Sequence, residues 1–211
     1  MDSHRRERFA QSSTSNEVDM SLGIETLLEE LVCGDDSRAE FAAIQLAEYG
    51  ESVEPAVRRT LESEEPDTRW WAMRTLAQMN QPPSELLLRS LTDTSAEVQQ
   101  CAILAICHHP VESAVPELLN IIAKTESLTC HLAASALISI GNGSIPELLT
   151  VFPNLTDIAR IEAMRAIACI EDPRAIPVLM AGLDEDSIMI NHWAEEGLER
   201  LGLGMVYLKP E

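Results

Sequence analysis

Five cysteines and five histidines are the residues of this chain that could carry out the most specific chemistry. Two stretches place the two residue types side by side, Cys107-His108-His109 and Cys130-His131. Thiolate and imidazole groups bind zinc, and a structural zinc site needs four such ligands around one point. Whether these side chains can converge depends on the elements that carry them.

The chain repeats itself at an interval of 30 or 31 residues. Residues 114–119 read AVPELL, residues 144–149 read SIPELL, and residues 176–180 repeat the pattern as IPVLM. Three columns of residues keep this interval, which composition alone does not explain. They are an alanine column (Ala42, Ala72, Ala102, Ala133, Ala163, Ala194), a first apolar column (Leu46, Leu76, Ile106, Leu137, Ile167, Leu198) and a second apolar column (Leu31, Leu61, Leu91, Ile122, Phe152, Leu183).

Each repeat is predicted to be a pair of helices. Around the alanine column, small and apolar residues recur at helical spacing, as at Ala163, Ala166 and Ile170, and therefore share one face of a helix. The following segment opens with proline, whose fixed φ and missing N–H suit the first turn of a second helix. No alternating run bounded by a hairpin turn is present, so no strand is expected. The prolines are Pro55, Pro116, Pro146 and Pro177.

Neither helix of such a pair can bury its apolar face alone, whereas a row of stacked pairs buries all of them together. The sequence therefore predicts an all-α fold, a right-handed α-α superhelix of about five helix pairs with a half-unit at each end. The alanine column fits this arrangement, because helix axes packed at roughly 8–10 Å need a residue without bulk at the closest contact.

The repeat register also predicts the boundaries. The five pairs run from about Asp36 to Asp186, between a helix at residues 20–33 and a helix at residues 187–201, so one solenoid is expected over residues 20–201. Residues 1–19 lack apolar periodicity and are expected to be a disordered tail, and residues 202–211 an apolar cap. The sequence shows no signal peptide and no apolar run long enough to cross a bilayer, which predicts a cytoplasmic location and no membrane contact.

The register decides the question of metal binding. Cys107 lies eight places later along its helix than Cys130 does on the next, a difference of about 12 Å in height at 1.5 Å per residue. Cys101, Cys130 and His131 come closer in height, but three ligands leave a structural zinc site incomplete. No metal is therefore expected. The cysteines, which also include Cys33 and Cys169, are expected to be free thiols that pack as small apolar groups in a reducing compartment.

With these residues in place, the repeat resembles a known family. The pattern A(I/V)Px-Leu-Leu opens one helix of the unit and R-x-x-A-x-x-x-Leu lies in the other, as in Arg69 to Leu76 and Arg160 to Ile167. This unit is similar to the HEAT-like repeat of phycobilin lyase subunits, the PBS lyase HEAT-like repeat. Asn191 and Cys130 depart from the arginine of the pattern. The resemblance covers about residues 22–201 and implies a HEAT-like, armadillo-type α solenoid; it does not by itself imply an activity.

The charge of the chain restricts its partners. Fifteen basic residues stand against 35 acidic ones, a net charge of −20, and without residues 1–19 the balance is still 12 against 31. A phosphate backbone would be repelled by such a field, because nucleic-acid binding depends on positive charge. No nucleic-acid partner is therefore expected.

The sequence contains no recognisable catalytic motif. A phosphate-binding loop, a Gly-x-Ser-x-Gly elbow and a Cys-x-x-Cys pair are all missing from the sequence. The repeat-built deoxyhypusine hydroxylases place iron on His-Glu dipeptides, and this sequence has none. We therefore predict no catalytic residues and no cofactor. Gly141-Asn142-Gly143 is interpreted as the turn between two helices of one repeat.

The remaining candidates lie on the surface. In stacked helical repeats the second helices commonly line a concave binding face. One position past the leucines of these helices, the outward residues begin with arginines, which recognise carboxylates bidentately. Trp70 falls in a polar column of the first helices and is added to the predicted partner-binding set, whereas Trp71 aligns with Phe41 and Trp193 and is expected in packing. The predicted set is Arg58, Arg59, Arg89, Asn120, Thr150 and Trp70.

Two functions fit these observations. The first is a non-enzymatic scaffold that binds a protein on the concave face, and it is favoured because no acid, base and nucleophile converge. The second, implied by the resemblance alone, is a bilin lyase subunit or phycobiliprotein chaperone, whose groove would hold a phycobiliprotein or its open-chain tetrapyrrole. If the protein is an enzyme, the resemblance makes it a phycobilin lyase subunit.

Overall fold

The computed structural model describes residues 23–124 and 128–204, and the secondary structure in these ranges is helical, without strands. The chain divides into two compact units at Pro83 and Ser84. The chain order of the helices reproduces the five predicted pairs, with helical residues 23–31 before them and one helix after them. The predicted all-α solenoid class is confirmed. The predicted tail at residues 1–19 and most of the predicted cap lie outside the described residues.

The described part of the first unit contains the helical residues 23–31 and three further α-helices. These are α2 (Asp36–Glu48), α3 (Glu54–Thr60) and α4 (Pro66–Gln78), with the 3-10 turn η1 (Gly50–Val53) between the first two. α4 packs against both α2 and α3. Pro55 lies in the first turn of α3, as predicted.

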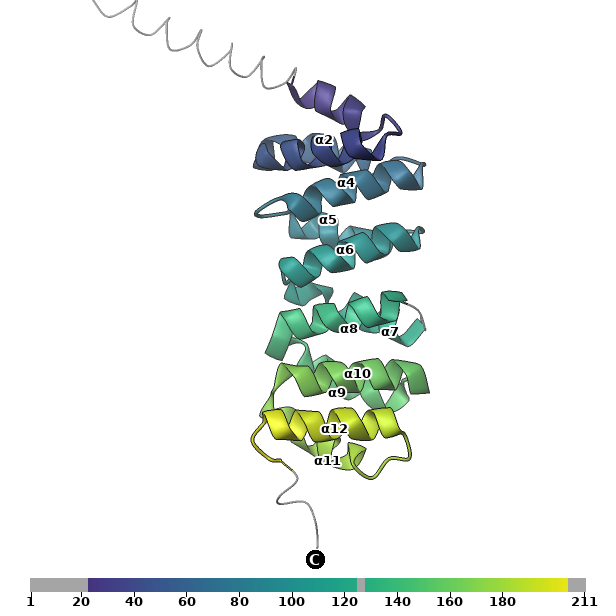
Figure 1. Ribbon diagram of the computed structural model, residues 1–211, viewed down its shortest axis with the longest axis vertical. Coiled ribbons are helices and arrows are strands. Elements are labelled where there is room, and N and C mark those ends of the chain that lie inside the picture. Colours follow the sequence, from purple (N-terminus) through teal and green to yellow (C-terminus); the bar gives the residue numbers. More distant parts are fainter. Residues whose placement is uncertain (1–22, 125–127, 205–211) are drawn as a thin grey trace, which may run out of the picture. The chain divides into compact units, whose positions relative to one another are not determined.

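The second unit continues the same alternation. Figure 1 shows α6, α8, α10 and α12 lying side by side in chain order, and each packs on the next. The shorter second helices pack against this row, α7 on α8 and α11 on α12. The helices are α5 (Ser84–Ser90), α6 (Ala96–His108), α7 (Val115–Lys124), α8 (Leu128–Ile140), α9 (Ile145–Val151), α10 (Asp157–Ile170), α11 (Ile176–Gly182) and α12 (Ile188–Arg200), with 3-10 turns η2 (Glu112–Ala114), η3 (Gly141–Gly143), η4 (Phe152–Asn154) and η5 (Pro173–Ala175).

The predicted columns form the core. All six residues of the alanine column have no exposed surface, and the first apolar column is at most 1% exposed. The second apolar column is buried up to Phe152 and half-buried at Leu183. A glycine marks one further close contact, because a Cβ on Gly197 would lie 2.9 Å from the Cα of Ala168. The small residues therefore let the first helices approach one another, as the register predicts.

The turns follow ordinary helix chemistry. The side chains of Asp35, Ser95 and Ser187 accept a hydrogen bond from the backbone N–H three residues on and so cap α2, α6 and α12. Gly141 has a φ of 77°, a left-handed conformation that a residue with a side chain rarely adopts. The predicted turn at residues 141–143 is confirmed as η3.

In four of the first helices, α4, α6, α8 and α12, one side chain of a shared column donates a hydrogen bond to a backbone carbonyl at the end of the preceding repeat. Arg69 is buried and donates to the carbonyl oxygens of Ser63 and Glu64, both at 3.0 Å. Three other members of the column reach the preceding chain in the same way. They are Gln99 to Asp93 at 2.8 Å, Cys130 to Ile122 at 3.9 Å and Asn191 to Leu183 at 2.7 Å. The arginine of the sequence pattern therefore holds a turn in place, and shorter polar groups can replace it.

Candidate binding surfaces

Five of the six predicted partner-binding residues lie on second helices. Arg58 and Arg59 are on α3 in the first unit, and Arg89, Asn120 and Thr150 are on α5, α7 and α9 in the second. Arg59, Arg89 and Thr150 are exposed, and Arg58 and Asn120 are half-buried. The expected outward direction of these positions agrees with their exposure, and their role in binding a partner remains a prediction.

Local contacts already engage several of these side chains. Arg58 forms an ion pair with Glu54 one turn earlier, at 3.0 Å. Asn120 donates to the carboxylate of Glu117 at 2.8 Å, and the Thr150 hydroxyl donates to the Pro146 carbonyl at 2.8 Å. A partner would have to compete with these contacts. Arg59 lies at an exposed position on the same helix and is the most accessible cation of the first-unit group.

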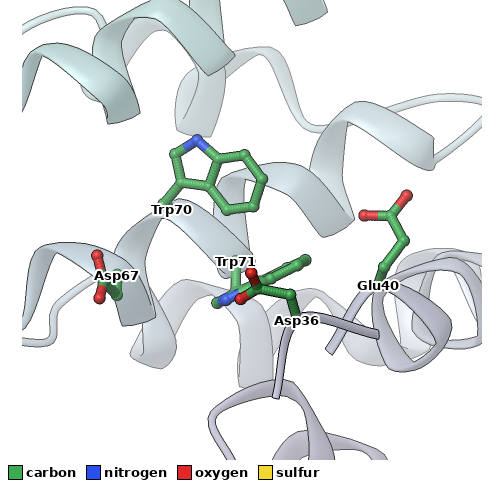
Figure 2. Close-up of a pocket in the computed structure, with 5 residues that line it drawn as sticks. All are labelled: Asp36, Glu40, Asp67, Trp70 and Trp71. Atoms are coloured by element: carbon green, nitrogen blue, oxygen red, sulfur yellow. The ribbon is translucent and has the colours of Figure 1, made fainter. Parts of the chain in front are cut away.

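Trp70 lies on a first helix, α4, and lines a hollow in the surface of the first unit. Its ring meets that of Trp71 edge to face, with centroids 4.7 Å apart and an angle of 85° between the ring planes. Figure 2 shows the two rings with the three carboxylates around them. The hollow measures about 440 Å³ and is called the tryptophan hollow; it is lined by Asp36, Glu40, Asp67, Trp70 and Trp71.

The three carboxylates of the tryptophan hollow differ in their surroundings. Glu40 accepts two hydrogen bonds from the Arg74 guanidinium, at 2.6 and 3.0 Å, which join α2 to α4. These bonds hold the pKa of Glu40 below its ordinary value, because they stabilise the ionised form. Within the described part of the chain, neither Asp36 nor Asp67 forms an ion pair. The hollow therefore has two carboxylates without an ion-pair partner among the described residues of the first unit.

A second hollow, of about 570 Å³, lies in the second unit and contains its own cation. Arg160 on α10 pairs with Glu185, and its guanidinium carbon lies 5.1 Å from the centre of the Phe152 ring. This arrangement joins a charge pair to a cation–π contact. The hollow is called the arginine hollow; it is lined by Asp157, Arg160, Asp184, Glu185, Asp186, Ser187 and Ile190.

The packing role expected of Trp71 from its alignment with Phe41 and Trp193 does not extend to every residue of that column. The Phe41 side chain is 63% exposed, whereas Trp71 and Trp193 are half-buried. The column to which a residue aligns fixes its position along the helix, but it does not fix which residues pack against its side chain. Phe41 lies on α2 and faces outward beside Ile44, which is 42% exposed.

The cysteines do not assemble a metal site in the ranges that the structure covers. Across residues 23–124 and 128–204, no group of three or more His, Cys, Asp or Glu side chains could hold a metal ion. Cys101 and Cys130 are buried, as their predicted packing role requires, but Cys33 is exposed. Burial raises the pKa of the Cys107 thiol and keeps it protonated and unreactive.

Neither hollow offers a histidine or a cysteine among its lining residues. The ring faces, the carboxylates, one guanidinium and the Ser187 hydroxyl that line the two hollows can recognise a charged group. The sequence singled out Trp70 as unusual. It did not single out Asp36, Glu40 or Asp67, whose only signal was their place near the N-terminal end of two consecutive first helices.

One repeat of the second unit matches a known family model. Residues 159–185, which span most of α10 and all of α11, match the family model of the PBS lyase HEAT-like repeat. The resemblance noted in the sequence is thereby confirmed, and the second unit carries a repeat of this kind.

Two curated proteins are similar to longer stretches of the chain. A phycobilisome maturation protein of Synechococcus elongatus is 29% identical over 56% of this chain and 58% of its own length. The phycocyanobilin lyase subunit beta of a Nostoc species is 30% identical over 42% of this chain and 45% of its own length. The chain thus spans about half the length of each of these two relatives.

A solved structure supports the fold. A designed armadillo repeat protein, crystallised in complex with the peptide (KR)4, superposes with a TM-score of 0.50 at 18% identity, over 83% of this chain and 98% of that one. At this identity the likeness concerns the fold alone. In the described residues, no helix is long and apolar enough to cross a membrane.

Proposed function

We propose that this chain is a non-catalytic module that binds a partner protein on the surface of its helical repeats. The observation that carries the proposal is the burial of the alanine and first apolar columns, at most 1% exposed throughout. Within each unit, the repeats bury these apolar faces against one another and leave the remaining surface of the helices available, which is how repeat proteins bind. Arg59 and Arg89 are the cations of that surface that the partner's carboxylates would meet first.

The charge of the chain also favours a protein partner over a nucleic acid. With 35 acidic and 15 basic residues, the field repels phosphate and attracts basic segments. A protein partner can present both signs, carboxylates to Arg59 and Arg89 and cations to the acidic hollows.

Capture of partners from the native host tests this proposal. We expect the Arg59→Glu/Arg89→Glu variant to melt within a few degrees of wild type, because exposed substitutions usually change stability by under ~0.5 kcal/mol. It should recover less of the partner, as quantified by mass spectrometry. The charge-matched control is Lys124→Glu/Arg200→Glu, whose residues are also exposed. Equal recovery by all three proteins would reject a role of Arg59 and Arg89 in partner binding.

A second candidate function is that of a bilin lyase subunit or phycobiliprotein chaperone. The observation that favours it is the names of the two curated relatives, one a phycobilisome maturation protein and the other a phycocyanobilin lyase subunit. Mixing the purified chain with phycocyanobilin, with and without a candidate partner subunit, tests it. A shifted visible absorption band supports this function, and an unchanged spectrum in both mixtures removes it.

A further inference from the structure

We propose that the tryptophan hollow binds the guanidinium group of an arginine in a basic segment of the partner protein. The inference rests on the proposed function. It adds a second contact with the partner, which lies on the first helices α2 and α4. It assigns a ligand class to Asp36, Asp67, Trp70 and Trp71, of which the sequence had singled out only Trp70 for binding.

The aromatic rings supply the first part of the argument. Because Trp70 and Trp71 meet at 85°, the ring face of one stands beside the edge of the other and the pair forms a corner. Both rings are half-buried, so each keeps surface toward the solvent. Tryptophan has the ring face that attracts cations most strongly, and arginine is the side chain that most often occupies it. The shape of this corner is suited to a planar cation such as a guanidinium group.

The charges supply the second part. Asp36 and Asp67 come from the first turns of α2 and α4 and line the same hollow as the two rings. Figure 2 shows Asp67 to one side of the tryptophan pair, and Asp36 lines the same hollow. Arg74 already neutralises Glu40, and the remaining two carboxylates lack a cation within the described residues. A guanidinium can pair with a carboxylate and stack on a ring at the same time, which an ammonium group does less well.

The second unit contains an example of this binding mode within the chain itself. In the arginine hollow, Arg160 pairs with Glu185 and lies over the Phe152 ring. On α2, the helix that corresponds to α10, the residue three places after Asp36 is Ala39, just as Arg160 is three places after Asp157. The arginine of the other helix, Arg69 on α4, donates to two backbone carbonyls. The tryptophan hollow therefore has the carboxylates and the rings of such a site but no arginine among its lining residues.

Other ligands fit the hollow less well. A metal ion is disfavoured, because in the described ranges the three carboxylates do not form a group that could hold one. An anion would meet two carboxylates without a paired cation. A purely apolar group would bury against the rings but leave Asp36 and Asp67 without a partner, which is unfavourable.

Nuclear magnetic resonance of the indole groups tests the inference. The chain has three tryptophans, so its indole N–H region should contain three cross-peaks. The probe is an acetylated and amidated Gly-Arg-Gly-Arg-Gly peptide, compared with its lysine counterpart at 0.15 M salt. We expect the arginine peptide to shift the Trp70 and Trp71 peaks and leave Trp193 in place, and the lysine peptide to bind about threefold more weakly. Shifts at Trp193 alone, or equal affinities for the two peptides, would overturn the inference.

Matched variants separate the hollow from the general acidity of the chain. Asp36 and Asp157 occupy the same repeat position in the two units, so Asp36→Asn and Asp157→Asn remove the same charge. The first should weaken the arginine peptide about threefold, and the second should change its affinity by less than about 1.5-fold. Trp70→Leu should weaken it about fivefold. If Trp70→Leu fails to fold, the Asp36→Asn result decides, and equal effects of the two asparagine variants would overturn the inference.

The two proposals can fail separately. If Asp36→Asn and Trp70→Leu capture the partner and bind the peptide as wild type does, the inference falls and the scaffold function stands. If the wild-type chain captures no partner while the indole peaks still shift with the arginine peptide, the scaffold function falls and the site stands.

Discussion

The two hollows lie at corresponding helices of the repeat, and only one of them has an arginine among its lining residues. In the arginine hollow, Arg160 reaches Glu185 and the Phe152 ring, so the second unit provides both the anion and the cation. In the tryptophan hollow, Ala39 stands at the position of Arg160, and neither Asp36 nor Asp67 has an ion-pair partner among the described residues. In our proposal, this difference makes the tryptophan hollow a binding site while the core of the repeat is unchanged.

Overpacking the alanine column should have the largest effect, and it should be the same in both units. Ala72 and Ala163 both have no exposed surface, and each lies on a first helix that packs against another first helix of its unit. We expect Ala72→Leu and Ala163→Leu each to lower the free energy of unfolding by about 1–3 kcal/mol, because the helices cannot separate to admit the larger side chain.

Urea denaturation measures this, with Ala181→Leu on α11 as an exposed control. The sequence makes the same prediction for Ala102→Leu. A variant as stable as wild type would contradict the packing of that column.

Truncating Arg69 in the first unit should lower stability more than truncating Arg160 in the second. Arg69 is 9% exposed and satisfies two carbonyl groups, which would be left without a donor in Arg69→Ala. We expect a loss of about 2 kcal/mol for Arg69→Ala and of less than about 1 kcal/mol for Arg160→Ala, whose ion pair is partly exposed. Chemical melts of the two variants provide the measurement. A larger loss of stability for Arg160→Ala than for Arg69→Ala would contradict this prediction.

The pH dependence of the tryptophan hollow should reside in Glu40. Its pKa is lowered in the folded state by the Arg74 hydrogen bonds, so the pair stabilises the fold above the ordinary glutamate pKa. That contribution is lost as the pH falls through the lowered folded pKa. In Arg74→Gln the pKa of Glu40 should return toward its ordinary value, as followed by a carboxyl NMR titration. Arg160→Gln is the control and should leave the Glu40 titration unchanged.

Neutralising a single exposed aspartate in either hollow should have the smallest effect on stability. Asp36 and Asp157 are exposed, and replacing either with asparagine should change the free energy of unfolding by less than ~0.5 kcal/mol. Thermal melts of the two variants check this. If Asp36→Asn lowers the free energy of unfolding by 1 kcal/mol or more, the Asp36 carboxylate stabilises the fold, which would contradict its assignment to ligand binding.

The fold could be predicted from the sequence because burial in a repeat depends on a few columns. Residues such as Ala102 and Ile106 recur at a fixed interval, and stacking places every member of a column in the same surroundings. An outer column behaves differently, because Phe41 shares a column with Trp71 but is 63% exposed. Residues of the alanine and first apolar columns are buried in every repeat, whereas the burial of residues in the outer columns differs from one repeat to the next.

The site could be predicted only in part. Trp70 stood out because a large ring replaced polar residues in its column, but the direction of a side chain is set by its neighbours and not by its register. Arg69 and Arg160 share a column, yet one binds backbone carbonyls and the other a carboxylate. The carboxylates of the tryptophan hollow come from two helices, and a column alignment does not show that they face one gap.

Intermolecular nuclear Overhauser effects between the arginine peptide and the protein would locate the bound guanidinium directly. The structure predicts cross-peaks from the arginine δ protons to the indole protons of Trp70 and Trp71, and none to the ring of Phe152, where Arg160 already lies. Cross-peaks to Phe152 without any to the two tryptophans would contradict the assignment of the tryptophan hollow as the site that receives a partner's arginine.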